Sequence, residues 1–362
     1  MALIDAVLER PGIPAELAAA GRIVRGRLRF YAGAYALAEG DLTAAVAAAR
    51  TTRDRPTLAA ALDLLGLCLL AQGRVDACEP YLMSSLEESR ACNATRAEGS
   101  TLSGLGTLAW SRGRLEEGET RYRAALSVFH ANGDRLGQGI TEGHLGNLHL
   151  LRGQLGEAVR AFERSVEILE QEGDHLTLAS MRCNFGLVLM ETGDLQAAEA
   201  QLTEALRELR EMGYRRFETI TLGNLGTLRH LQGRLSEAAD LLETAARAAG
   251  TIGDRRTEGY LRGALGAVLS DRDALRDAEV AFDLADARLR EVGDELGIGL
   301  VDLTRAHLDL AQGRAARRHG RDAMARAALA RAEARMAAIH PASHEQRLAL
   351  VLARKARDAA SG

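Results

Sequence analysis

Glycine recurs along this chain at a fixed interval of 40 residues, and that interval restricts the fold to an array of repeated units. One series falls at Gly66, Gly106, Gly146, Gly186, Gly226 and Gly266, a second at Gly73, Gly113, Gly153, Gly193, Gly233 and Gly313, and a third at Gly133, Gly173, Gly213, Gly253 and Gly293. The second series has a gap at Asp273. These series hold 17 of the 37 glycines, so chance does not explain the spacing.

Each series predicts a different structural role. The first lies inside apolar segments such as Leu102-Leu105-Gly106, where a glycine costs roughly 1 kcal/mol against alanine and therefore indicates a close approach of helices. The second is typical of the left-handed residue that ends a helix. The third is usually followed by aspartate, as in Gly133-Asp134, which predicts that glycine ends one helix and aspartate caps the next.

The apolar residues between these glycines follow a helical period. Small or apolar residues recur with steps of four and three, first at Ala158, Phe162 and Ser165 and then at Ala198, Leu202 and Ala205. Such steps keep one face of a helix turned inward. Each unit is therefore predicted to be two antiparallel helices, and we expect no strands.

The pattern resembles the tetratricopeptide repeat (TPR). Leu-Gly pairs at 105–106, 145–146, 225–226 and 265–266, with Ala-x-x-x-Phe at 158–162 and 278–282, carry the resemblance, which spans about residues 20–340. The 40-residue length is similar to the long repeats of spindle-orientation adaptors, kinesin light chains and the C-terminal arrays of bacterial signalling ATPases and transcription activators. The resemblance implies an all-α fold, a right-handed α-α superhelical solenoid. Glu142, Arg182 and Arg262 depart from the family by occupying its tryptophan position.

We predict three parts: a short lead-in helix over 1–14, about eight helix pairs over 15–341, and a capping helix over 342–362. The first unit is expected to be shortened, because Gly40-Asp41-Leu42 lies 33 residues before Gly73. The last unit is expected to carry extra residues after Gly313. The final helix would cover the last apolar face, as solenoids require.

Composition and motifs argue against several classes of function. The net charge is −4, and the sequence shows no membrane-length apolar run and no signal peptide. Four widely spaced cysteines favour reduced thiols and a cytoplasmic location. There is no P-loop, HExxH, CxxC or Ser/His/Asp elbow. We therefore expect no catalysis, no cofactor and no metal site, and Pro341 between His340 and His344 favours a capping role for that pair over metal binding.

The resemblance implies that the first helices line a concave groove. Asparagine near its centre often bonds the main chain of a peptide in the family, although Asn184 and Asn224 could instead satisfy groups between helices. Trp110 could be a binding hot spot or a packing residue. The predicted groove residues are Ser103, Thr107, Trp110, His144, Asn147, Asn184, Met190, Asn224, Thr227, His230 and Tyr260.

The main hypothesis is a non-catalytic scaffold whose groove binds a peptide or helix of a partner protein. The alternative is the C-terminal sensor or regulatory array of a larger bacterial signalling ATPase, kinase or transcription regulator. Residues 314–362 carry a net charge of +7, including Arg314, Arg317, Arg318 and Arg321. This basic end is interpreted either as a solvated cap or as a docking patch for an acidic partner or another copy, that is, weak self-association. No membrane partner is expected, and nucleic acid ranks last because no aromatic residue lies among these arginines.

Overall fold

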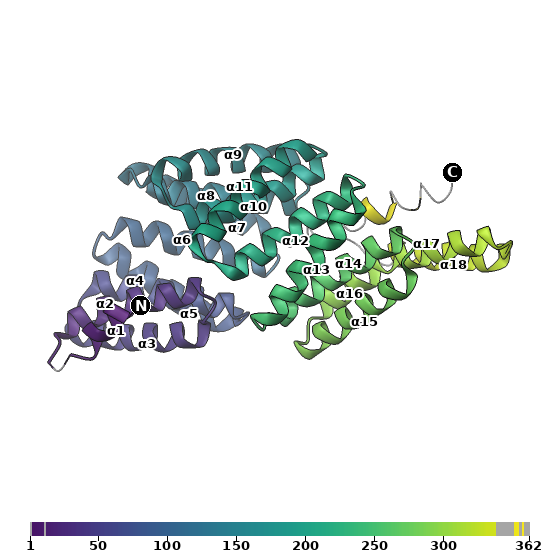
Figure 1. Cartoon of the computed structure of the whole chain (residues 1–362). Helices are drawn as coiled ribbons and strands as arrows, with labels where there is room; N and C mark the ends of the chain where they lie inside the picture. The colour runs from purple at the N-terminus through teal and green to yellow at the C-terminus, as the bar shows by residue number, and fades with distance from the viewer. Residues whose placement is uncertain (1, 11, 338–350, 355–356, 358–362) are drawn as a thin grey trace. The chain divides into compact units, whose positions relative to one another are not determined.

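The computed structural model describes residues 2–10, 12–337, 351–354 and 357, and all regular secondary structure in this part is helical (Figure 1). The prediction of an all-α solenoid of repeated helix pairs is confirmed. The helices form two compact bodies, Met1–His149 with Arg160–Asp174, and Leu150–Val159 with His175–Gly362. None of the described helices is long and apolar enough to cross a membrane.

The first body contains a short lead-in helix followed by four helix pairs. Helices α8 and α9 each place a few residues at one end in the second body. The helices are α1 (Ala2–Leu8), α2 (Ala15–Tyr31), α3 (Tyr35–Thr52), α4 (Arg55–Ala71), α5 (Val75–Ala91), α6 (Thr95–Ser111), α7 (Leu115–Asn132), α8 (Arg135–Leu151) and α9 (Leu155–Glu172).

The second body continues the same alternation until its last unit. There the first helix breaks at Arg305 into two shorter helices. The helices are α10 (His175–Thr192), α11 (Leu195–Met212), α12 (Arg215–Leu231), α13 (Leu235–Thr251), α14 (Arg255–Asp271), α15 (Leu275–Glu291), α16 (Glu295–Thr304), α17 (Ala306–Arg318) and α18 (Asp322–Ala337). Within this body α12 contacts α14, and α14 contacts α16 and α17, so first helices of successive units pack on one another.

The predicted helix ends are confirmed at most junctions. Gly133 and Gly213 adopt left-handed conformations with φ of 71° and 73°. The Asp134 carboxylate accepts a hydrogen bond from the Gly137 N–H at 2.9 Å, which is the predicted cap. The first two junctions differ, because Arg53 and Asn93 take the left-handed position without glycine.

The first unit corrects one prediction. Its turn lies at Gly33, where φ is 77°, and Gly33 is a full 40 residues before Gly73. The unit is therefore not shortened, and Gly40 lies inside α3. Asp41, which we took for part of the turn, is buried and pairs with Arg25 and Arg29 at 2.6 Å.

The last unit corrects another. Gly313 is buried inside α17 and does not end it. The left-handed turn residue is Gly320, with φ of 67°, seven residues later. The extra residues therefore lie within the first helix of this unit and not after it. The break at Arg305 divides that helix into α16 and α17.

Close approach within a unit explains the first glycine series, as predicted. A Cβ atom added to Gly186 would lie 2.7 Å from Cγ of Leu202 on the paired helix, and one added to Gly146 would lie 2.7 Å from the Phe162 ring. Real Cβ contacts are essentially never so short. A side chain at these positions therefore requires Leu202 or Phe162, or the helix that carries it, to shift.

Ion pairs occupy the family's tryptophan position in three units. Arg182 on α10 reaches Glu208 on α11 at 2.5 Å, and both are buried. Glu142 pairs with Arg164, and Arg262 with Glu243. At these three positions an ion pair between helices therefore takes the place of the contact that an aromatic ring makes in the family.

The predicted capping helix lies mostly outside the described residues. Of 342–362 the structure describes 351–354 and 357. Leu352 and Ala353 are buried there, and Ala353 belongs to the same apolar cluster as Leu303 and Ala306.

Candidate functional site

The predicted groove residues of the first body lie on α6 and α8. Ser103 on α6 and the Nδ1 atom of His144 on α8 are 3.0 Å apart, so this polar contact joins two first helices. The Thr107 hydroxyl lies 3.0 Å from the Tyr122 hydroxyl on α7. Trp110 and Asn147 are partly exposed. Burial lowers the pKa of His144 to about 4, so this imidazole is neutral at pH 7.

The remaining predicted residues belong to the second body, on α10, α12 and α14. Asn224 donates its amide N–H to the Cys183 sulfur at 3.1 Å, which joins α12 to α10. This is the inter-helix role that we weighed for the asparagines. Tyr260 donates its hydroxyl to Asp294 at 2.9 Å. Met190 is buried, whereas Asn184 and Thr227 are partly exposed.

A pocket of about 140 Å³ opens among the first helices of the second body. Its walls are largely apolar, and its polar side chains come from α12, α14, α16 and α17. It is lined by Leu187, Gly223, Asn224, Thr227, His230, Leu242, Tyr260, Leu261, Gly263, Ala264, Ala267, Leu300, Val301, Thr304, His307 and Leu352. Four of the predicted groove residues, namely Asn224, Thr227, His230 and Tyr260, therefore share one pocket.

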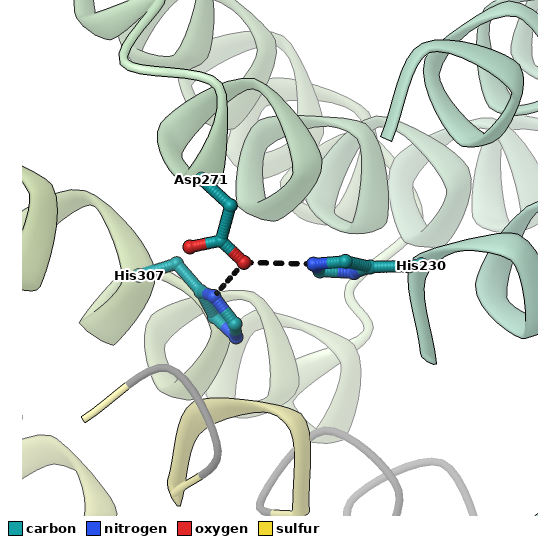
Figure 2. Close-up of side chains that lie close together, drawn as sticks. All are labelled: His230, Asp271 and His307. Carbon is teal, nitrogen blue, oxygen red and sulfur yellow. Dashed lines mark hydrogen bonds and ion pairs between the residues drawn. The ribbon is translucent and has the colours of Figure 1, made fainter. Parts of the chain in front are cut away.

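Two histidines of this pocket converge on one carboxylate, which Figure 2 shows. Nε2 of His230 on α12 lies 2.8 Å from Oδ2 of Asp271, and Nδ1 of His307 on α17 lies 3.0 Å from the same oxygen. The two imidazole centroids are 5.4 Å apart. Asp271 is the last residue of α14, so the three side chains link three successive units. We call them the His–Asp–His cluster.

The partners of Asp271 decide its ionisation. Burial alone would raise the pKa of this carboxyl, but the hydrogen bonds from His230 and His307 outweigh burial and hold that pKa well below its usual range. Asp271 is therefore a carboxylate at neutral pH. It lies between nitrogen atoms that can donate protons to it or share a cation with it.

Comparison with known proteins agrees with the helical register. Residues 98–171, 140–211 and 177–251 match the model of the tetratricopeptide repeat family. Residues 98–251 therefore carry tetratricopeptide repeats, and the fold of the chain is TPR-like. No protein of curated function is similar to it in sequence.

Several solved TPR-like structures share the fold at low identity. The apo form of RapI has a TM-score of 0.63 and 10% identity, covering 88% of this chain and 97% of its own. A Rap protein complexed with Competence and Sporulation Factor has a TM-score of 0.63 and 12% identity, covering 90% and 99%. The Rap conjugation gene regulator of the plasmid pLS20, in complex with the Phr* peptide, has a TM-score of 0.55 and 19% identity, covering 69% and 67%.

The 40-residue spacing of the repeats also assigns His307 to the groove, although it is absent from the predicted groove residues. Thr107, Asn147 and Thr227 were assigned to the groove from one repeat position, and Ala267 and His307 follow Thr227 at further steps of 40. The cluster itself was missed, because its members are 41 and 36 residues apart and match no ligand motif.

Two arginines of the predicted basic patch already have acidic partners. Arg318 pairs with Asp273 at 3.0 Å, and Arg314 lies 3.7 Å from the same residue. Arg314 also donates to the Ser270 carbonyl oxygen at 3.3 Å. Arg317 lies on the same helix, and Arg321 is exposed. The solvated-cap interpretation accounts for Arg314 and Arg318, and docking through this end stays a prediction.

The three buried cysteines offer no activated thiol. Burial raises the pKa of Cys68, Cys78 and Cys183 above its ordinary value. Cys78 is fully buried, in agreement with the core position expected for it. His340 and His344 lie outside the described residues.

Proposed function

We propose that this protein is a non-catalytic interaction scaffold that binds a peptide or helix of a partner protein on its first helices. The observation that carries the proposal is the pocket among α12, α14, α16 and α17, where apolar walls surround a few polar side chains. Such a combination is typical of sites that bind a side chain and orient it.

The size of the pocket suggests what enters it. A volume of about 140 Å³ is close to the ~150 Å³ apolar cavity that accommodates benzene in another protein. One leucine or phenylalanine side chain of a peptide would fit. Beside it, the Asn224 amide donates one N–H to Cys183, and the Thr227 hydroxyl donates to the Gly223 carbonyl oxygen. The amide oxygen and second N–H of Asn224 and the acceptor capacity of Thr227 would bond the main chain of the peptide.

Structural neighbours support a peptide ligand by analogy. One Rap structure contains the Phr* peptide and another Competence and Sporulation Factor. At 19% and 12% identity these neighbours indicate the fold alone, so the analogy guides the choice of ligand and does not identify it.

The chemistry of the described residues favours binding over catalysis. The Ser103–His144 pair comes nearest to a nucleophile and its base. Ser103 is buried, and an imidazole with a pKa of about 4 is a weak base at neutral pH. We therefore assign the pair to packing between α6 and α8.

The test is selection of peptides from a random display library on the full chain, followed by calorimetry on the selected peptides. Filling the pocket with Ala264→Leu should weaken binding at least tenfold, about 1.4 kcal/mol. Asn224→Ala should weaken it as well. The matched control is Ala200→Leu on exposed α11 surface, which should bind as the wild type does.

Two results would contradict the proposal. Selected peptides that bind Ala264→Leu and Asn224→Ala at wild-type strength would place the site elsewhere, and Trp110→Ala would then test the first body. Peptide cleavage by the wild type would contradict the non-catalytic assignment. The alternative of an array within a larger regulator predicts a nucleotide-binding or kinase domain encoded upstream in frame, which sequencing of the locus would test.

A further inference from the structure

We propose that the His–Asp–His cluster binds one divalent transition-metal ion of the zinc class. The inference is independent of peptide binding, since it depends only on the donor atoms of His230, Asp271 and His307. One ligand atom from each residue lies within 4.8 Å of the others. Two imidazoles and a carboxylate form a ligand set that suits zinc, with room for a further ligand.

The distances fit a tetrahedral ion with little movement. Bonds of ~2.0–2.1 Å place neighbouring ligand atoms about 3.3 Å apart. In the structure the two imidazole nitrogens lie 2.8 Å and 3.0 Å from Oδ2 of Asp271. Oδ2 and each imidazole nitrogen would therefore need to part by up to about half an ångström, and the two nitrogens, which lie within 4.8 Å of each other, would need to reach the same spacing.

Hydrogen bonding alone leaves part of the cluster unsatisfied. His307 is 1% exposed, and its Nε2 atom is buried with no hydrogen-bond partner among the described residues. Coordination of a metal through Nδ1 would fix the tautomer that carries its proton on Nε2, although it would not itself supply a partner for that atom.

The charge around the cluster is compatible with a cation. Arg314 is the nearest guanidinium, and its Nη2 lies 4.0 Å from Oδ1 of Asp271, the oxygen that the imidazoles do not contact. Asp273 lies 3.7 Å from the same guanidinium nitrogen and offsets its charge. Oδ2 faces the two imidazoles, while Oδ1 is buried without a hydrogen-bond partner among the described residues.

Position in the fold gives the ion a structural consequence. His230 lies on α12, Asp271 on α14 and His307 on α17, so a bound ion would tie three successive first helices together. A ligand that binds only the folded chain raises stability in proportion to its occupancy. Zinc should therefore raise the melting temperature, and the α16–α17 break would be held against α14.

The test uses the tag-free full chain, freed of metal by a chelator, and Zn²⁺ as the probe. Calorimetry and competition with a chromophoric chelator should show one Zn²⁺ per chain, and Zn²⁺ should raise the melting temperature reversibly. Asp271→Asn preserves the shape of the side chain and should weaken Zn²⁺ binding at least about tenfold. Asp240→Asn is the control: it removes an exposed carboxylate on α13 of the same body, outside the cluster, and should bind Zn²⁺ as the wild type does.

A second measurement does not depend on variants. X-ray absorption at the zinc edge should show nitrogen and oxygen neighbours with imidazole scattering from two histidines in the wild type. Absence of stoichiometric Zn²⁺ binding by the wild type would overturn the proposal. So would equal affinity of the wild type and Asp271→Asn, since the ion would then be bound elsewhere.

Discussion

Buried carboxylates meet different partners in the two bodies of this protein. Asp63 in the first body accepts a hydrogen bond from the Ser100 hydroxyl at 2.6 Å, and burial raises its pKa to about 6. Asp271 in the second body lies between two imidazoles, and its pKa is held well below the usual range. The same helix-pair backbone thus allows opposite ionisation behaviour, because the partner and not the burial decides it.

Contacts between helices also differ in kind, although charge pairs occur in both bodies, as Asp41 with Arg25 and Arg29 shows in the first. In the first body the Ser85 hydroxyl lies 2.8 Å from that of Thr101, and Ser103 meets His144. In the second body Arg182 pairs with Glu208, and Arg288 with Glu258 at 3.0 Å. A lost hydroxyl contact costs ~1 kcal/mol, whereas a buried charge left alone costs several. Hydroxyl contacts and buried charge pairs should therefore respond differently to the loss of one partner.

The largest effect is expected from removing one member of a buried ion pair. Arg182→Ala leaves the buried Glu208 carboxylate without its cation. We expect a loss of ~3–5 kcal/mol in the free energy of unfolding, measured with urea. Replacing both partners, Arg182→Met with Glu208→Leu, should restore stability to the wild-type level or above. A single variant as stable as the double variant would show that Glu208 is not penalised and would weaken the comparison.

A pH effect of about 3 kcal/mol is expected from Asp63. Its folded pKa of about 6 exceeds its ordinary value of 3.8, so Asp63 stabilises the fold below pH 3.8 and loses that contribution as pH rises through 6. Each pH unit between those values is worth ~1.4 kcal/mol. The stability of the wild type relative to Asp63→Asn should therefore fall between pH 4 and pH 7.

Measuring that difference by urea unfolding at several pH values separates Asp63 from the other carboxyl groups, because they titrate in both proteins. If the difference in stability between the wild type and Asp63→Asn did not change with pH, the hydrogen bond from the Ser100 hydroxyl would cancel the effect of burial on the pKa of Asp63. That result would also remove the contrast with Asp271.

Packing glycines should behave alike in both bodies. Gly146→Leu and Gly186→Leu each place a side chain where even a Cβ atom would lie 2.7 Å from the paired helix, so each should cost ~1–3 kcal/mol. Gly299→Leu is the control, because that helical glycine faces open space. Thermal unfolding would measure all three. A wild-type melting temperature for Gly186→Leu would mean that the contact is loose, and unequal losses would show that the bodies differ in more than polar chemistry.

The fold was predictable because backbone geometry leaves a periodic mark. Glycines at 40-residue steps predicted the helix pairs, the left-handed turns and the tight contacts such as Gly186 against Leu202. The errors at the two ends share a cause. Glycine at positions 40 and 313 predicted turns there. The turns instead lie at Gly33 and Gly320, where φ is positive.

The site was less predictable, because it depends on which side chains meet across units. The register assigned Asn224 and His230 to the inner surface, but it could not tell that Asn224 bonds Cys183 or that His230 and His307 meet at Asp271. His307 reaches that point from a first helix that breaks at Arg305. A break of this kind shifts side chains without changing the glycine spacing before it.

The smallest effect should come from an exposed ion pair with the same chemistry as Arg182–Glu208. Arg318 pairs with Asp273 at 3.0 Å, but the two side chains are 59% and 41% exposed. Water solvates both charges when the pair is broken, so Arg318→Ala should cost at most ~1 kcal/mol. That cost should shrink as salt is added, since salt screens exposed charges over ~10 Å at 0.1 M. Urea unfolding of Arg318→Ala and Arg182→Ala at low and high salt measures both. If the loss for Arg318→Ala approached that for Arg182→Ala, burial would not be what makes the charge pairs of the second body costly to break.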